Sequence, residues 1–348
     1  MINLRSDNCS AVHPKIREAL LADLLQAADD GDSYDRVFED RLNAAFSAVF
    51  GCEMVAVTTA TGTGANVVSI ASLRDESVAG AILCHPAAHV RCWEHDAVRR
   101  YTGAGELVTV DGPDGTMTPD ALRETLARLG PRSAGGVLSL TNPTECGTLY
   151  TLEDLAALTR IAHEAGLRVH LDGARLGNSL CALGLSAAEL IAAAPFDAIS
   201  FGGTKVGALA AEAALFRAPS DAVRKRGQTH QRAFGQRQAK RRMVEVQLLR
   251  LIEDDLWLEI ARQQNALCAT FADGLQGQPP VRFRYPHPTN QLFLEPTDEI
   301  LSAIRELNIR HTIWPDGSVR LVFGYDFEHK TVSDLAAKIT EYFAETQI

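Results

Sequence analysis

Short apolar runs alternate with amphipathic segments over most of the chain. Runs typical of buried strands lie at 54–60, 79–85, 105–112, 135–142, 167–175, 196–205 and 208–216, and the last is expected to turn back beside the one before it. Apolar residues with helical spacing lie between them at 61–73, 119–129 and 152–166, and Thr118 is the expected N-cap of the second of these helices. This alternation predicts an α/β fold whose mainly parallel sheet is covered by helices. Ligands of such sheets bind at the carboxyl ends of the strands.

The pattern changes after the last of these runs. A basic, polar stretch precedes a long helical pattern over 244–275, which we expect to break near Asp254. Two strand-like runs, QLFLEP and SVRLVFGY, and the amphipathic segment SDLAAKITEYFAE complete the chain. We predict an N-terminal segment and large domain over residues 1–245 and a small C-terminal α+β domain over 246–348.

Composition narrows the classes of partner. The 348 residues carry a formal net charge of −10 at pH 7, which argues against nucleic acid or an anionic membrane as the main partner. No apolar run reaches the roughly 20 residues that cross a bilayer. The seven cysteines are scattered without a CxxC pair, and MINLRSDNCS does not look like a secretory signal. These features predict a protein of the reducing cytoplasm.

Two strand-like runs each end near a candidate catalytic residue. LRVHL delivers Asp172 to its carboxyl end, with Arg175 three residues later. A carboxylate there needs a partner or solvent, so a structural Asp172–Arg175 pair is an alternative to a role in binding. SFGGTK ends the next run with Lys205 after two glycines, which permit a sharp turn or a close approach to a ligand. A lone loop lysine is commonly just solvated, and that alternative stays open.

The segment TATGTGAN (59–66) joins a strand to a helix through small residues. Free amides at a helix N-terminus bind phosphate, although an ordinary tight turn is equally compatible with this segment. It lacks the third glycine of the dinucleotide-binding pattern and the Gly-Lys of the phosphate-binding loop. Together the three segments supply an anion cradle, a carboxylate and an amine. Pyridoxal phosphate (PLP) needs these parts, for its phosphate, its pyridine nitrogen and its aldehyde.

A resemblance to the L-threonine aldolases lies in LRSDN, TGTGAN, HLDGAR and SFGGTK. That family belongs to the fold-type-I PLP enzymes and the aromatic β-eliminating lyase superfamily. The segments SLTNPTECGTLY, ALAAEAALF and EDDLWLEIARQQNA resemble its low-specificity bacterial branch in particular. The resemblance runs over nearly the whole chain in the same order. It implies a large domain with a mainly parallel seven-stranded sheet and a small C-terminal α+β domain.

The resemblance also implies roles for individual residues. Lys205 would hold PLP as a Schiff base, Asp172 would pair with the pyridine nitrogen, and His89 would stack on the ring. Arg175 would lie beside both cofactor and substrate. The implied phosphate ligands are Thr61, Gly62 and Thr63, assisted by Thr204. The implied substrate-binding residues are Ser6, Tyr34, Arg175 and Arg320, of which Ser6 and Arg320 would bind the carboxylate.

Several of these residues have simpler alternatives. An arginine in the strand-like SVRLVF is costly unless paired, so Arg320 either binds a carboxylate with two hydrogen bonds or forms a salt bridge with an acid such as Asp326. Apart from the resemblance, His89 is a partly buried polar residue at a strand end. Glu145 aligns where other branches carry a histidine near the substrate hydroxyl. It is a candidate catalytic base, directly or through water, or an exposed loop acid.

The chain departs from the family pattern mainly on the substrate side. After His89 the low-specificity branch usually reads Glu-Cys-Gly-Ala-Pro-Glu, where this chain has EHDAVR from Glu94 onward. Only Tyr34 remains of an early Tyr-Gly-x-Asp, and Val206 replaces the usual asparagine after the lysine. His95 adds a titratable group that is a further candidate base. These changes bear on the choice of substrate more than on PLP binding.

The implied reaction is retro-aldol cleavage of L-threonine, L-allo-threonine or a related β-hydroxy-α-amino acid into glycine and an aldehyde. Another PLP reaction on the same scaffold, such as β-elimination or racemisation, is an alternative. An alternative of a different class is a non-catalytic homologue that keeps the fold as a binding protein. The resemblance further implies a homodimer or homotetramer, and no metal site is expected.

Overall fold

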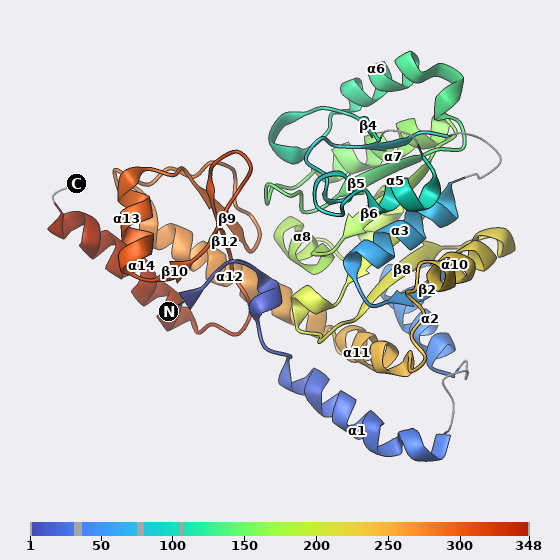
Figure 1. Ribbon diagram of the computed structural model, residues 1–348, viewed down its shortest axis with the longest axis horizontal. Coiled ribbons are helices and arrows are strands. Elements are labelled where there is room, and N and C mark those ends of the chain that lie inside the picture. Colours follow the sequence, from blue (N-terminus) through green and yellow to red (C-terminus); the bar gives the residue numbers. More distant parts are fainter. Residues whose placement is uncertain (1, 31–36, 75–79, 105–106, 347–348) are drawn as a thin grey trace.

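A computed structural model of the protein describes residues 2–30, 37–74, 80–104 and 107–346. It consists of a large α/β unit and a smaller unit that holds both ends of the chain (Figure 1). The two units are joined by the long helix α12 (Leu256–Leu275), which begins in one and ends in the other.

A seven-stranded sheet forms the centre of the large unit, in the order β2-β8-β7-β6-β5-β3-β4. Its strands are β2 (Met54–Thr59), β3 (Ile82–Cys84), β4 (Val108–Thr109), β5 (Val137–Thr141), β6 (Arg168–Gly173), β7 (Ala198–Gly202) and β8 (Glu212–Arg217). As predicted, β8 turns back to run antiparallel to β7, and it is also antiparallel to β2. The pairs from β7 to β4 are parallel. The carboxyl ends of β5, β6 and β7 therefore lie side by side.

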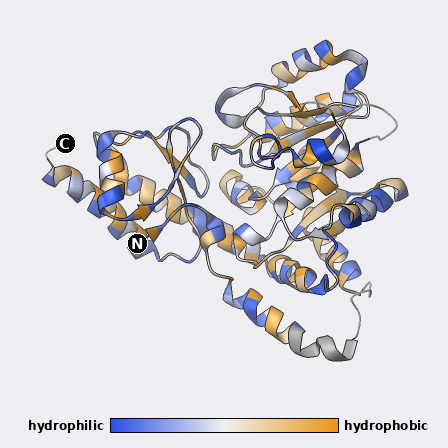
Figure 2. Cartoon of the chain, viewed as in Figure 1, coloured by the Kyte–Doolittle hydropathy of each residue, from blue (hydrophilic) through white to orange (hydrophobic). Residues whose placement is uncertain are grey.

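Helices cover both faces of the sheet (Figure 1). On one face α3 contacts β7 and β8 and packs against α5 and α10, while on the other α2 contacts β2 and α7 contacts β6. Figure 2 shows apolar residues concentrated in the strands, whereas the outer helix α10 is largely polar. The helices of this unit are α1 (Pro14–Asp30), α2 (Val37–Phe50), α3 (Gly62–Leu73), α4 (His89–Cys92), α5 (Ala97–Thr102), α6 (Pro119–Leu129), α7 (Leu152–Glu164), α8 (Leu176–Leu183), α9 (Ala187–Ala193), α10 (Asp221–Ala233) and α11 (Arg242–Glu253).

Short 3₁₀ turns and helix caps follow the local sequence. The turns are η1 (Asp7–Cys9), η2 (Pro113–Gly115), η3 (Gly130–Ser133) and η4 (Thr204–Val206). Thr118 caps α6 as predicted, because its Oγ1 accepts the amide of Ala121 at 3.2 Å. No single helix in the described ranges is both long and apolar enough to cross a membrane; α8 and α9 meet the length and composition criteria only as a pair bent by 85°.

The smaller unit packs a three-stranded antiparallel sheet, β11-β12-β9, against helices. Its elements are β9 (Gln291–Leu294), α13 (Asp298–Glu306), β10 (Ile309–Arg310), β11 (Thr312–Ile313), β12 (Val319–Val322) and α14 (His329–Glu345). The N-terminal strand β1 (Ile2–Asn3) pairs in parallel with β10, so residues from both ends of the chain build this unit.

The helical pattern after residue 244 breaks where predicted. Helix α11 ends at Glu253 and α12 begins at Leu256, with Asp255 in the left-handed region at φ 51°. Helix α12 contributes Trp257 to the core of the large unit and Phe271 to that of the smaller one. The domain boundary near residue 245 stays a prediction.

Candidate active site

The carboxyl ends of β5, β6 and β7 meet at one cavity. Asp172 in β6 lies opposite Thr141 in β5 and Ser200 in β7, and Lys205 follows β7 on η4. The empty space here, which is continuous with solvent, measures about 360 Å³. Its wall includes Gly62, His89, Glu145, Asp172, Arg175 and Lys205. The structure thus brings the amine, the carboxylate and the start of α3 around a single space.

Asp172 is buried and held as an anion. Asn66 Nδ2 donates to its Oδ2 at 2.9 Å, and the backbone amide of Ala174 donates to its Oδ1 at 3.1 Å. Burial alone would raise the pKa of Asp172, but interactions with His89 and Lys205 hold it below its usual value. A buried carboxylate that stays charged can keep a pyridine nitrogen protonated.

Two glycines allow the turn that presents Lys205. A Cβ atom on Gly202 would lie 2.3 Å from the carbonyl oxygen of Ala174, and one on Gly203 would lie 2.4 Å from that of Ala211. Both contacts are with backbone, which cannot move aside cheaply. The glycines therefore bring this loop against its neighbours more closely than another residue could.

Glu212 anchors the same turn to β8. Its carboxylate accepts the amides of Gly203 at 3.2 Å and Thr204 at 3.3 Å. Burial raises the pKa of Glu212 to about 7. Burial also lowers the pKa of Lys205, and the charge of Arg175 lowers it further. A lysine of lowered pKa offers its neutral, nucleophilic amine more readily.

The N-terminus of α3 lies at the cavity with backbone donors to spare. Thr61 is the N-cap and accepts the amide of Gly64 at 3.0 Å. The amides of Gly62 and Thr63, at the first helical positions, have no acceptor within the described residues. A Cβ atom on Gly62 would meet nothing within 4 Å, so there is open space beside them. Donors and helix dipole together suit a phosphate.

His89 begins α4 and is tied to a buried acid. Its Nδ1 lies 2.9 Å from Oε1 of Glu94, whose side chain is entirely shielded from solvent. Burial would lower the pKa of His89, but the hydrogen bond to Glu94 and the charges of Glu145 and Asp172 raise it. Asn66 Nδ2 donates to the same oxygen of Glu94 at 2.7 Å. The residue expected at the cofactor ring therefore belongs to a hydrogen-bond network.

Arg175 pairs with Asp7, so the alternative of an Asp172–Arg175 pair is wrong. Its Nε and Nη2 donate to the two oxygens of Asp7 at 2.6 and 2.9 Å. Burial would raise the pKa of Asp7, but Arg175 lowers it to about 2. Asn290 adds a hydrogen bond to Asp7 at 3.1 Å. Ser6 lies beside this pair, with its Oγ 3.4 Å from an oxygen of Asp7.

Arg320 is buried without a carboxylate partner within the described residues. Its Nη2 and Nε donate to the neutral Oε1 of Gln291 at 2.6 and 3.3 Å, and its guanidinium carbon lies 4.7 Å from the ring centroid of Trp314. Asp326 instead accepts the amide of Ala11 at 3.2 Å, and Arg320 is bonded to Gln291, so the alternative of an Arg320–Asp326 salt bridge is wrong. Burial lowers the pKa of Arg320 to about 10, which leaves it charged at neutral pH.

Glu145 stands among the cations of the site. It lies in the cavity wall, half-buried, and its charge acts on His89, Lys205 and Arg320. A carboxylate in this position can reach a group bound in the cavity, so the structure keeps Glu145 as a candidate base and does not leave it as an exposed loop acid.

The remaining predicted residues lie less centrally. Thr204 is half-buried, and its Oγ1 accepts the amide of Ala211 at 3.3 Å. His95 is exposed, next to the αL residue Asp96, and is not part of the cavity wall. Tyr34 lies outside the described residues.

Sequence reasoning missed four residues that hold the site together: Asp7, Asn66, Glu94 and Gln291. Asp7 and Asn66 stand inside two of the motifs, and Asn66 is the bulky polar residue in the first turns of an otherwise small and apolar helix, GTGANVVSIASL. That contrast was an available signal. Gln291 had none, because its importance depends on which side chain lies beside it.

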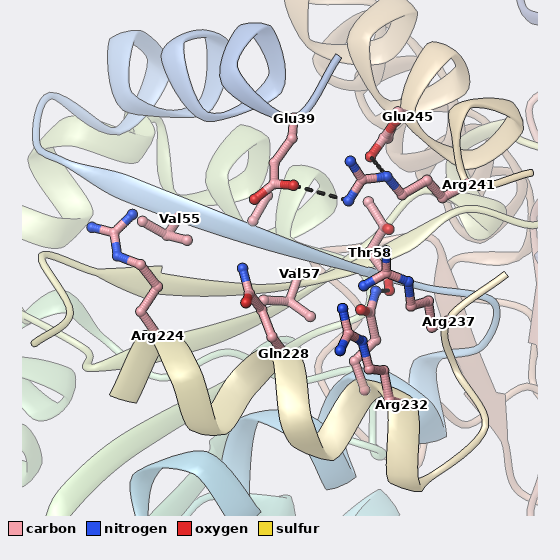
Figure 3. A pocket seen from close by; sticks show the side chains of 12 residues that line it. Glu39, Val55, Val57, Thr58, Arg224, Gln228, Arg232, Arg237, Arg241 and Glu245 are labelled. Atoms are coloured by element: carbon pink, nitrogen blue, oxygen red, sulfur yellow. Dashed lines mark hydrogen bonds and ion pairs between the residues drawn. The ribbon is translucent and has the colours of Figure 1, made fainter. Parts of the chain in front are cut away.

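A second cavity, with about 770 Å³ of empty space, lies against the edge strand β2 (Figure 3). Its wall carries Arg224, Gln228, Arg232, Arg237 and Arg241, with Glu39 and Glu245 each within reach of Arg241, at 2.9 and 3.5 Å. No lysine is among its lining residues. It is larger than the first cavity but lacks the lysine that imine chemistry needs.

PLP fits the residues of the first cavity. Its phosphate matches the free amides of α3, its pyridine nitrogen matches Asp172, and its aldehyde matches Lys205. Asn66 Oδ1 and Glu94 Oε2 are buried and lack a partner within the described chain, which suits a polar group placed beside them.

Fold and site together define a PLP-dependent enzyme of fold type I. The chain belongs to the beta-eliminating lyase family, which residues 3–297 match. Among its relatives, a low-specificity L-threonine aldolase of Pseudomonas sp. is 29% identical over 96% of each chain, and that of Pseudomonas aeruginosa is 28% identical over 96% of each.

Solved structures show the same fold. The threonine aldolase of Leishmania major superposes with a TM-score of 0.86 at 22% identity, covering 98% of this chain and 99% of that one. An aspartate aminotransferase of Thermus thermophilus superposes with a TM-score of 0.69 at 15% identity, covering 98% and 96%. The seven-stranded PLP-binding architecture expected from the sequence is confirmed.

Proposed function

We propose that the chain cleaves L-threonine, L-allo-threonine or a related β-hydroxy-α-amino acid into glycine and an aldehyde. The observation that carries this proposal is Arg320. A buried guanidinium whose hydrogen-bond partner is neutral Gln291 keeps its charge for an incoming carboxylate. Beside a cavity that fits PLP, this is what an amino-acid substrate requires.

Each residue has a defined part in this reaction. Bound PLP would supply an electron-accepting ring for the electrons of the broken Cα–Cβ bond. Lys205 would hold its aldehyde, Asp172 its pyridine nitrogen, and the Gly62 and Thr63 amides its phosphate. Arg320 would fix the substrate carboxylate and so select which bond at Cα is aligned to break. Ser6 and Arg175, which both lie next to Asp7, would assist Arg320 in binding the substrate.

A base must remove the β-hydroxyl proton as the Cα–Cβ bond breaks. Glu145 and His89 both line the cavity and are the two candidates, directly or through water. The names of the two Pseudomonas relatives, low-specificity L-threonine aldolases, support the choice of threonine-like substrates.

The test is a product assay on the PLP-loaded protein with L-threonine, L-allo-threonine and phenylserine. We expect equal amounts of glycine and aldehyde. Release of ammonia with a 2-oxo acid would instead establish β-elimination, and inversion at Cα without cleavage would establish racemisation. A purified protein that cannot be reconstituted with PLP would support the binding-protein alternative.

We further propose that the chain acts as a homodimer or homotetramer in the cytoplasm. Thr61, at the expected phosphate site, is exposed in the single chain, and a second copy would shield it. All seven cysteines are free thiols, as expected in a reducing compartment. Light scattering of the purified holoenzyme tests the assembly; a monomeric, fully active protein would contradict it.

A further inference from the structure

Glu94 is a buried carboxylate to which the reaction as described assigns no part. It follows α4 and is only 4% exposed. Its Oε1 is shared by two donors: His89 Nδ1 lies at 2.9 Å and Asn66 Nδ2 at 2.7 Å. The same Asn66 nitrogen donates to Asp172 Oδ2 at 2.9 Å. One oxygen of Glu94 therefore joins the histidine at the cofactor face to the acid at the expected pyridine site.

The negative charge of Glu94 has one evident partner, the ring of His89. A buried carboxylate is costly unless it is paired, and no arginine or lysine forms a salt bridge with Glu94 in the part of the chain that the structure describes. The acids that act on His89 are Glu94 beyond α4, Glu145 after β5 and Asp172 in β6, while the cations Arg175 and Lys205 line the same cavity. Glu94 is the one of these groups that is hydrogen-bonded to His89, and together the three acids favour the protonated ring.

We propose that Glu94 is a positioning residue that fixes the ring and the protonation of His89, which leaves Nε2 as the nitrogen that exchanges a proton with the bound amino acid. This inference rests on the proposed lyase reaction in the same cavity. Nδ1 is occupied by Glu94, and the partner of one ring nitrogen decides the state of the other. His89 would carry the proton, and Glu94 would touch neither substrate nor cofactor.

The same contact sets the direction of Asn66. Its Nδ2 lies between two carboxylate oxygens and must be the donor to both, which directs a hydrogen bond at Asp172. Asn66 Oδ1 and Glu94 Oε2 remain buried and without a hydrogen-bond partner in the described residues. Groups left partly unsatisfied in this way are expensive, and they persist where function needs them.

A cation site is the competing interpretation of this cluster. Ligand atoms of His89, Glu94 and Asp172 lie within 4.8 Å of one another. The Asn66 N–H group already occupies the space between the two carboxylates, and a cation there would face a donor. Activity that falls on dialysis against EDTA and returns with a divalent metal would overturn our proposal in favour of this interpretation.

The decisive variant is Glu94→Gln in the PLP-loaded protein. The amide keeps the shape but loses the charge, so we expect the limb of the kcat/KM pH profile that reports His89 to move to lower pH. We also expect kcat to fall by roughly 10²-fold, the lower range for general acid–base catalysis. Glu94→Asp should recover part of both effects, and it serves as the test should the amide variant fold poorly.

The matched control is Asp96→Asn, the same chemical change two residues away. Asp96 is bonded to Arg99 outside the cavity, and asparagine tolerates its αL conformation. We expect its pH profile to equal that of the wild type. An unchanged profile in Glu94→Gln, or an equal shift in Asp96→Asn, would overturn the proposal.

A readout independent of turnover separates this proposal from the proposed reaction. In protein with ¹⁵N-labelled histidine, the two ring signals of His89, assigned by their loss in His89→Asn, report which nitrogen carries the proton. We expect a protonated Nδ1 in the wild type and a changed proton distribution in Glu94→Gln. Unchanged signals would refute the role of Glu94 even if glycine is released. Changed signals without glycine release would refute the proposed reaction but would still support the role of Glu94 in fixing His89.

Discussion

The two buried arginines of the site have opposite surroundings. Arg175, on the large-unit side, is neutralised by the bidentate contact with Asp7, whereas Arg320, from β12 of the smaller unit, is bonded only to the neutral amide of Gln291 in the described structure. The charge of Arg175 is thus paired within the folded chain. The charge of Arg320 has no ion-pair partner in the described residues, and under the proposed function the substrate carboxylate would supply one.

The largest expected effect is on the cofactor side. Lys205→Ala removes the amine that would hold the aldehyde, so we expect the visible absorbance of bound PLP to disappear and glycine release to fall by several orders of magnitude. Lys330→Ala is the control, because Lys330 is exposed and paired with Asp334 on α14. A Lys205→Ala protein that kept both the band and full turnover would contradict the assignment.

Asp7→Asn tests whether the paired arginine depends on its partner. Removing one member of a buried ion pair leaves Arg175 uncompensated, and we expect the free energy of unfolding to drop by about 3 kcal/mol. Urea denaturation at fixed PLP concentration measures it. Because the pKa of Asp7 falls from 3.8 to about 2 on folding, its contribution is present above 3.8 and is lost as the pH drops toward 2. The variant should lack this part of the acid dependence.

Arg320→Met tests the uncompensated arginine. We expect KM to rise roughly 10–100-fold, because hydrogen bonds to charged groups contribute about 1.5–3 kcal/mol each. The spectrum of bound PLP should not change. Arg310→Met, at an exposed position on β10, provides the control. Loss of PLP together with an unchanged KM would show that Arg320 serves cofactor binding and not substrate binding.

The smallest effect is expected from giving Arg320 a carboxylate partner like the one that Arg175 has. Gln291→Glu gives Arg320 a carboxylate partner where the amide oxygen now lies 2.6 Å away. The new acid competes with the substrate, and we expect KM to rise several-fold with little change in kcat. Gln291→Met, which is neutral, should raise KM less. Equal values in the two variants would show that the charge of the partner does not matter.

Elements with a strong local pattern were predictable. The seven strand-like runs became the seven strands of the sheet, and α6 begins after its predicted cap at Thr118. The run at 105–112 was predicted too long, since β4 covers only Val108–Thr109 in the described chain. Alternation and capping are set by neighbouring residues, and they can be recognised without knowing the partners of a segment.

Pairings over long separations were not predictable in this way. Asp7 and Arg175 are 168 residues apart, and their contact requires η1 to lie against the loop after β6. A sequence pattern suggested the nearer Asp172 as partner, because spacing along the chain is all that it measures. The same limit applies to Arg320, for which the nearer Asp326 was an alternative and Gln291 is the actual neighbour.

The sequence by itself determined the chemical inventory: a lysine and an aspartate at successive strand ends, small residues at the start of a helix, and an arginine in a late strand. These follow from local patterns of polarity and turn chemistry. Only the tertiary structure decided which charges are neutralised and which stay available, because that depends on packing between segments distant in the chain. The burial of Glu94 against His89 and the contact of Arg320 with a neutral amide both depend on such packing.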